Sequence, residues 1–161
     1  MKKKNIQVSV LMGSKSDMDT VQEAINVLKD FKIHYAVKIL SAHRTPKDLV
    51  RYVEGLPGKG CAVVIAAAGM SAALAGTIAA HTILPVIGIP IETRALKGLD
   101  SLLSTVQMPK GIPVACMSIG KSGAQNAAIL ACQILALKDK NLKKKLLQFK
   151  NNMAKAIRKK R

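Results

Sequence analysis

Short apolar runs alternate along the chain with longer segments in which apolar and polar positions repeat at helical spacing. The short runs are rich in β-branched or small apolar residues and are bounded by Gly, Pro or polar turns, which predicts strands. The run CAVVIAA leaves no polar face, so we expect a strand that is covered on both sides. The predicted strands cover residues 6–12, 33–40, 61–67, 85–90 and 113–119.

The segments between these runs predict helices. In residues 18–31 the apolar positions recur three and four apart, as they do on one face of a helix. The next helix is expected to start at Pro46, with Thr45 as its cap and an apolar face that includes Leu49 and Val53. Further helices are predicted over residues 69–82, 101–108 and 122–137, and after Asp139.

Strands that alternate with helices predict a parallel sheet with right-handed crossovers. The expected fold class is a three-layer, flavodoxin-like α/β domain with a five-stranded parallel sheet, plus a C-terminal amphipathic helix. We expect residues 1–161 to form a single domain, with an α/β core over 1–137 and a basic helix over 138–161. In such sheets ligands bind outside the carboxyl ends of the strands, so the loops that follow the strands are the place to look for a site.

Composition narrows the class of protein. Hydrophobic residues make up 49% and charged residues 22% of the chain, which favours a globular protein over a disordered one. The three cysteines, Cys61, Cys116 and Cys132, lie far apart, so we expect small buried hydrophobes in a reducing compartment. No stretch has the pattern of a signal peptide or a membrane span, and the expected location is cytoplasmic.

The formal net charge of +17 is concentrated near the C-terminus, where residues 138–161 carry eleven Lys or Arg against one Asp. A basic domain that binds RNA or DNA is therefore one hypothesis. A solvated basic helix is the simpler interpretation, because the aromatic platforms of many single-strand binders are missing from the sequence. The same segment carries a narrow apolar stripe formed by Leu142, Leu146, Phe149, Met153 and Ile157.

The loop MGSKSD follows the first predicted strand. Gly13 permits a tight turn, and Ser14 and Ser16 place hydroxyls and amides at the start of a helix, where an anion is favoured. Asp17 suits the hydroxyls of a ribose better than a phosphate. Alternatively, Ser16 or Asp17 only caps the helix. The loop matches neither the nucleoside-triphosphate nor the dinucleotide glycine motif.

The loop SAHRTP follows the second predicted strand. His43 can move a proton in either direction near neutral pH, and Arg44 offers a fork for a phosphate or carboxylate. The alternative is an exposed loop with a helix cap at Thr45. We favour a site, because a proton carrier and an anion fork lie together at the ligand edge of the sheet. His34 and His81 lack such neighbours and are expected to be structural, and no zinc site is predicted.

Two further loops, AAAGMSAALAG and GKSGAQNAA, are rich in small residues. Small side chains allow a flat ring or a small molecule to approach the backbone. They equally allow close packing between a helix and the sheet, or between subunits. The residues alone leave these alternatives open.

Taken together, the segments resemble a known family. MGSKSD, SAHRTP, AGMSAALAG, DSLLSTVQMPKGIPV and IGKSGAQNAAILACQIL are similar, in order and spacing, to the class I 5-(carboxyamino)imidazole ribonucleotide mutases of the PurE family, over residues 6–137. The resemblance implies an isomerase of de novo purine (IMP) biosynthesis that uses no metal or organic cofactor. It implies transfer of a carboxylate from the exocyclic nitrogen of a nucleotide substrate to ring carbon 4, with carbon dioxide trapped as an intermediate.

The resemblance also implies roles for residues and partners. His43 matches the proton-shuttling histidine, and Ser14, Asp17 and Arg44 match nucleotide-binding positions. The family assembles as homo-octamers, and the pathway that the resemblance implies leads us to expect a transient contact with the ATP-dependent carboxyaminoimidazole ribonucleotide synthase. Neither a membrane nor a nucleic acid is implied as a partner. The positions that match residues lining the pocket are Ser41, Ala42, Ala68, Gly69 and Leu74.

One segment departs from the family pattern. Many members read AHLPG where this chain reads AALAG, so Ala73 replaces a histidine and Ala75 a proline. His43 is then the only histidine in a motif. A rival hypothesis within the same fold is a carboxylase that acts directly on the aminoimidazole ribonucleotide, but the animal-type carboxylases differ in this region.

Overall fold

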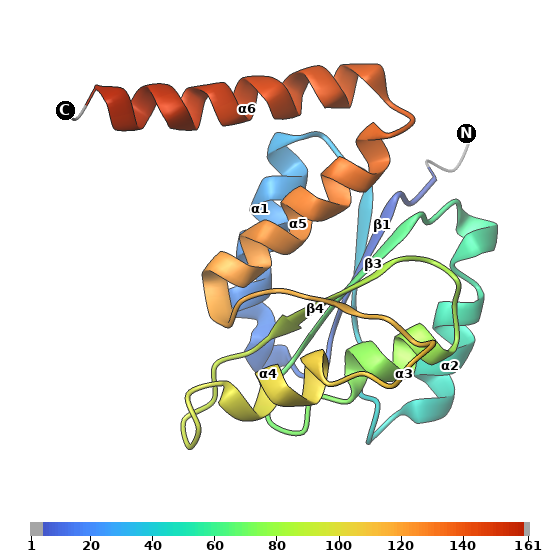
Figure 1. The fold of residues 1–161 in the computed structure, drawn as a ribbon. Helices are drawn as coiled ribbons and strands as arrows, with labels where there is room; N and C mark the ends of the chain where they lie inside the picture. Colours follow the sequence, from blue (N-terminus) through green and yellow to red (C-terminus); the bar gives the residue numbers. More distant parts are fainter. Residues whose placement is uncertain (1–4, 160–161) are drawn as a thin grey trace.

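A single parallel sheet organises residues 5–159, the part of the chain that the computed structural model describes (Figure 1). Its strand order is β2-β1-β3-β4-β5, which is the flavodoxin-like order. The expected fold class is therefore confirmed. The strands are β1 (Val8–Met12), β2 (Tyr35–Ile39), β3 (Val63–Ala68), β4 (Val86–Pro90) and β5 (Ala115–Cys116).

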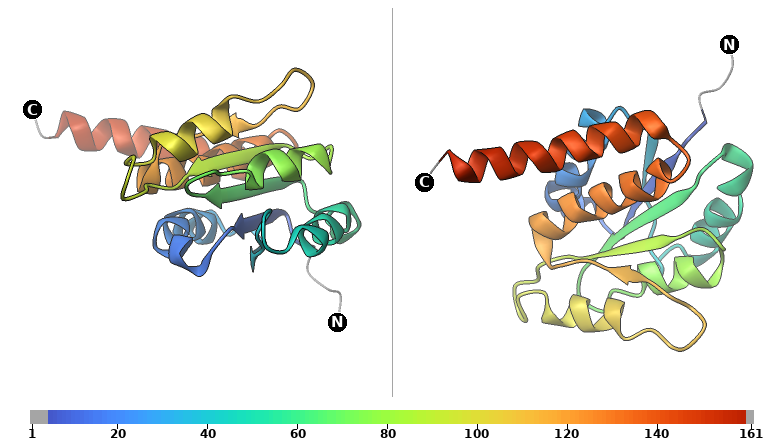
Figure 2. Two further views of the ribbon diagram at one scale, coloured as in Figure 1. Left: turned by 90° about the horizontal axis from the view of Figure 1, so that it is seen from below. Right: turned by 45° about the horizontal axis from the view of Figure 1, so that its top comes forward.

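Helices cover both faces of the sheet. On one face α1 and α5 pack side by side against alternate strand residues such as Val10 and Ile65. On the other face α2 and α3 pack against residues such as Leu11 and Val64, and α4 packs against β4 and β5 (Figures 1 and 2). Both layers are built from aliphatic side chains, as the scarcity of aromatic residues requires. The helices are α1 (Met18–Asp30), α2 (Pro46–Glu54), α3 (Leu74–Ala80), α4 (Leu99–Val106), α5 (Gly120–Ala136) and α6 (Lys140–Arg158), with short 3-10 turns η1 (Lys15–Asp17) and η2 (Pro57–Lys59).

Two predicted elements have half their expected length or less in the structure. The helix expected over residues 69–82 begins only at Leu74, because the chain first makes a turn in which Met70 has a φ of 58°. The edge strand expected over 113–119 pairs only at Ala115–Cys116, although the amide of Met117 still donates to the carbonyl of Gly88. Pro113 has no amide proton to add to the ladder.

The prediction that the side chain of Thr45 caps α2 is wrong. Thr45 does occupy the position before α2, but its hydroxyl makes no bond to the first turn of that helix. It bonds instead to both backbone groups of Ser41. The first turn of α2 therefore depends on Pro46 rather than on a side-chain cap.

The cysteines follow the sequence expectation closely. Cys61 and Cys132 are buried and Cys116 is partly buried, and all three are free thiols. None of the helices within residues 5–159 is both long enough and apolar enough to span a membrane.

Helix α6 crosses one end of the domain and projects beyond it (Figures 1 and 2). Its first half packs on its own chain, where Leu142 and Leu146 are buried and the ring of Phe149 meets that of Phe31 edge to face at 5.7 Å. Further along the same stripe, Met153 is 46% and Ile157 is 67% exposed. The stripe predicted from sequence is thus half covered by the chain itself.

Candidate functional site

The carboxyl ends of four strands lie at one level. Met12 is in register with Ile39 on one side and with Ala67 on the other, and Ala67 is in register with Ile89. The amide of Gly13 donates to the carbonyl of Ala67 over 3.1 Å, so the first loop leaves the sheet in contact with β3. Strand order reverses between β1 and β3, which is where such sheets bind ligands.

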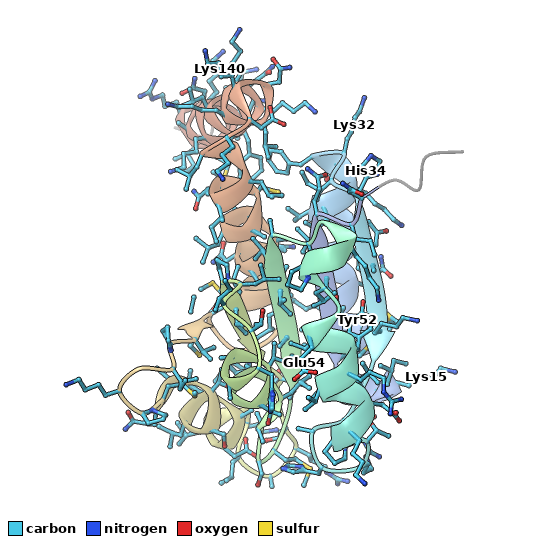
Figure 3. The ribbon with its side chains drawn as sticks, turned by 90° about the vertical axis from the view of Figure 1, so that its right-hand side faces the viewer. Lys15, Lys32, His34, Tyr52, Glu54 and Lys140 are labelled. Carbon is cyan, nitrogen blue, oxygen red and sulfur yellow. The ribbon has the colours of Figure 1, made fainter. Side chains whose placement is uncertain are left out.

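A cavity of about 820 Å³ opens at this edge. It lies at the end of the molecule opposite α6: Figure 3 shows Lys15, in the first loop, far from Lys140 at the start of α6. The concentrated charge of the C-terminal segment is therefore remote from the cavity. All nine residues singled out from the sequence line it, namely Ser14, Asp17, Ser41, Ala42, His43, Arg44, Ala68, Gly69 and Leu74.

The first loop holds Asp17 in a fixed position. The amide of Ser14 donates to one carboxylate oxygen of Asp17 over 3.0 Å, and the hydroxyl of Ser16 donates to the other over 3.3 Å. Asp17 is only 7% exposed, and its burial raises the pKa of the carboxyl, against the lowering effects of these hydrogen bonds and of Arg44. Asp17 occupies the position before α1 but makes no side-chain cap to that helix; its carboxylate instead closes the capping box of η1 and lines the cavity.

The second loop is tied to the first by Arg44. Its Nη2 donates to the carbonyl of Gly13 over 3.1 Å, and its Nε donates to the hydroxyl of Ser41 over 3.4 Å. The remaining guanidinium N–H groups are left for a ligand, and such a fork suits a phosphate or a carboxylate. His43 is exposed at the cavity wall, one residue before this arginine.

Sequence reasoning missed one wall of the cavity. The loop after β4 contributes Ile91, Glu92, Thr93 and Arg94, although none of these was given a role. The sequence did contain a signal for this wall, because the polar loop follows a predicted strand at the same edge of the sheet. Met70 and Ser71, which were given no individual role, also line the cavity, and so do Gly13 and Ser16 of the first loop.

This wall is held by hydrogen bonds from α4. The hydroxyl of Thr93 donates to Asp100 over 2.8 Å, and the buried hydroxyl of Ser101 donates to the carbonyl of Ile91 over 2.6 Å. Gly69 lies against the same wall, since a Cβ there would come within 3.4 Å of the Thr93 side chain. A glycine at position 69 therefore allows both close packing against this wall and an open cavity.

The other small-residue segment, GKSGAQN, forms the start of α5 and does not line this cavity. A Cβ at Gly123 would overlap the carbonyl of Ser118, so Gly123 is explained by close packing. The first residues of α5 line a neighbouring cavity of about 630 Å³. The Lys121 ammonium there pairs with Asp19 over 3.0 Å.

The remaining histidines lie outside the cavity. His34 precedes β2, and its amide donates to the Gln7 side chain. His81 follows α3 and its Nδ1 lies 3.8 Å from a carboxylate oxygen of Glu54. Ala73 lines the cavity with a methyl group, so His43 is the only imidazole on its wall among residues 5–159. Within those residues, no group of three side chains could hold a metal ion.

The strand order and the cavity at the switch point, with His43, Asp17 and Arg44 on its wall, define a flavodoxin-like α/β protein with a candidate ligand site. The sequence model of the AIR carboxylase family matches residues 7–156, and the chain belongs to that family. The match runs into α6, beyond the segments that carry the resemblance in the sequence.

Relatives and a solved structure agree with this membership. The N5-carboxyaminoimidazole ribonucleotide mutase of Pyrococcus abyssi is 50% identical over 91% of this chain and 83% of its own. The protein of the same name from Bacillus subtilis is 47% identical over 93% of each chain. The crystal structure of Treponema denticola PurE has a TM-score of 0.86 at 30% identity, covering 95% of this chain and 94% of that one.

Proposed function

We propose that this protein is an N5-carboxyaminoimidazole ribonucleotide mutase of de novo purine (IMP) biosynthesis. It interconverts 5-(carboxyamino)imidazole ribonucleotide and 5-amino-1-(5-phospho-ribosyl)imidazole-4-carboxylate. The observation that carries the proposal is the grouping of His43, Asp17 and Arg44 around one cavity, in a chain about half identical to relatives with that name.

The nucleotide is proposed to bind across the first two loops. Asp17 accepts hydrogen bonds from the ribose hydroxyls, since its carboxylate is held by backbone and side-chain donors with its oxygens at the cavity wall. Arg44 and Ser14 bind the phosphate, for which the guanidinium fork supplies charge and paired N–H groups. The imidazole ring then lies against Ala42, Ala68, Gly69 and Leu74, with Ser41 at the edge of the same surface.

His43 is proposed to carry the one proton that the reaction moves. Cleavage of the bond between the exocyclic nitrogen and the carboxylate carbon leaves the electron pair on nitrogen, which takes a proton from the His43 imidazolium. Carbon 4 of the resulting aminoimidazole attacks the retained carbon dioxide. Neutral His43 then removes the proton from carbon 4, so the histidine ends protonated, as it began.

The assembly is proposed to be a homo-octamer in which the distal half of α6 docks on another subunit. The exposed Met153 and Ile157 continue a stripe whose first half is already buried, and an apolar stripe needs a surface to pack against. A cytoplasmic location is proposed because all three cysteines are free, as expected in a reducing compartment. We also propose a transient contact between this protein and the ATP-dependent synthase that makes the unstable carbamate.

The test is an ultraviolet absorbance assay of the purified protein with each of the two carboxylated isomers. Interconversion of these isomers without added bicarbonate is the expected result. Turnover of the unsubstituted aminoimidazole ribonucleotide with bicarbonate, in preference to the isomers, would identify a carboxylase instead. Tight, steeply salt-dependent binding of RNA or DNA without turnover of any nucleotide would favour the nucleic-acid hypothesis.

A further inference from the structure

The turn from Ser41 to Thr45 carries both His43 and Arg44, and it is closed by one side chain. The hydroxyl of Thr45 accepts a hydrogen bond from the amide of Ser41 over 3.0 Å and donates one to the carbonyl of Ser41 over 3.2 Å. The amide of Thr45 also donates to that carbonyl over 3.0 Å. Two of the three bonds that close the turn therefore depend on the Thr45 hydroxyl.

Ser41, whose backbone is fixed in this way, in turn holds Arg44. The hydroxyl oxygen of Ser41 accepts from the amide of Arg44 over 3.1 Å and from its Nε over 3.4 Å. A serine oxygen has two lone pairs, so both are occupied, and the hydroxyl proton is left to be donated. Ser41 lines the cavity, and that proton is available to an acceptor on the ligand.

The usual role of a threonine before a helix does not account for this geometry. A capping hydroxyl accepts from amides in the first turn of the helix, and Thr45 makes no such bond to α2. Its hydroxyl is directed backward into the turn. Thr45 itself does not line the cavity, so any effect it has on the ligand passes through Ser41 and Arg44.

We propose that Thr45 is a positioning residue of the site. By clamping both backbone groups of Ser41, it orients the Ser41 hydroxyl and, through it, the Arg44 guanidinium toward the phosphate of the nucleotide. This inference rests on the proposed mutase function. Because the phosphate is remote from the reacting atoms, loss of the clamp weakens substrate and transition state alike, which raises KM and changes kcat little.

The test compares Thr45→Val, which keeps the shape of the side chain but removes the hydroxyl, with Thr45→Ser, which keeps the hydroxyl. In the ultraviolet assay Thr45→Val is expected to raise KM roughly tenfold and to change kcat less than about threefold, while Thr45→Ser stays near the wild type. The matched control is Thr82→Val, because the Thr82 hydroxyl also accepts from a backbone amide, that of Leu84, and neither residue lines the cavity. This control is expected to leave KM unchanged.

A second readout does not depend on turnover. Hydrogen exchange at the Ser41 amide is expected to accelerate in Thr45→Val and not in Thr45→Ser, since the hydroxyl is the acceptor for that amide. An unchanged KM in Thr45→Val, or a fall in kcat alone, overturns the positioning role. If the wild type converts neither isomer, it is the mutase proposal that fails. Unaltered exchange at the Ser41 amide in Thr45→Val would show separately that the clamp is absent in solution.

Discussion

The guanidinium of Arg44 donates to the carbonyl of Gly13, and this 3.1 Å bond joins two loops that are 31 residues apart in the chain. The arginine therefore does more than offer charge to a ligand. It fixes the distance between the loop that carries Asp17 and the loop that carries His43. The spacing of these two groups is set before a nucleotide arrives.

Replacing Arg44 by lysine tests this relationship. Lysine keeps the positive charge but has no fork with which to reach Gly13, Ser41 and a ligand together. We expect KM for the carboxylated nucleotide to rise about 10- to 100-fold, as loss of a charge-assisted bond of about 1.5–3 kcal/mol implies. Steady-state kinetics followed by ultraviolet absorbance measure this KM. Arg51→Lys is the control, because Arg51 pairs with exposed Asp48 and does not line the cavity, and an equal effect there would contradict the prediction.

Replacing His43 by asparagine is expected to abolish interconversion of the isomers, with at least about a 100-fold loss of kcat, because asparagine cannot carry a proton. Nucleotide binding, measured by calorimetry, is expected to survive, since Arg44 and Asp17 remain. His34→Asn and His81→Asn serve as controls, because both imidazoles lie outside the cavity. Turnover retained in His43→Asn would refute the assigned role.

The buried carboxyl of Asp17 predicts a pH dependence of stability. Its pKa is raised by burial, so its contribution to stability is complete below the unfolded pKa and declines as pH rises through the folded pKa. Asp17→Asn does not titrate. We therefore expect the free energy of unfolding of this variant to improve relative to the wild type between about pH 3 and pH 7. Urea unfolding at several pH values measures the difference, and a difference that is flat or falls with pH would disagree.

The thiols are expected to differ in reactivity. Burial raises the pKa of the Cys132 thiol to about 11, and burial also raises the pKa values of the Cys61 and Cys116 thiols. Only the partly buried Cys116 is accessible enough to react in the folded protein. Titration with Ellman's reagent should give at most one thiol natively and three in denaturant, and Cys116→Ser should remove the native signal. Rapid reaction of Cys132 in the folded state would contradict this burial.

The exposed half of the α6 stripe tests the proposed assembly. Met153→Asp with Ile157→Asp is expected to dissociate the oligomer, as measured by light scattering, because both side chains are exposed in the single chain. The fold should survive, since Leu142, Leu146 and Phe149 still pack on the domain. Lys155→Gln is the control on the opposite side of the helix. An intact oligomer in the aspartate variant, or after truncation behind Leu137, would count against docking through α6.

The strand pattern of the sequence predicted the fold, and its loops predicted residues that the structure brings together at the candidate site. The features that were missed have physical causes. The start of α3 was placed too early because small residues over 69–73 fit a helix and a turn equally well, and only the positive φ of Met70 separates them. The role of Thr45 was missed because a hydroxyl before Pro46 has the pattern of a cap, whereas its bonds to Ser41 depend on the shape of the turn. Glu92 and Arg94 were missed because no local motif marks them.

The carboxyl ends of β1, β2, β3 and β4 lie at one level, and this alignment limits how the protein can be redesigned. A residue inserted into one loop leaves the strand ends level, but in either of the first two loops it must preserve the Arg44–Gly13 bond that joins them. A residue deleted from β1 shifts the strand by about 3.3 Å and turns its side chains to the opposite faces. Because β1 lies between β2 and β3, that deletion would misalign the first loop against both of its neighbours. New substrate preferences are therefore best sought by changing loops on unaltered strands, with the first two loops exchanged together.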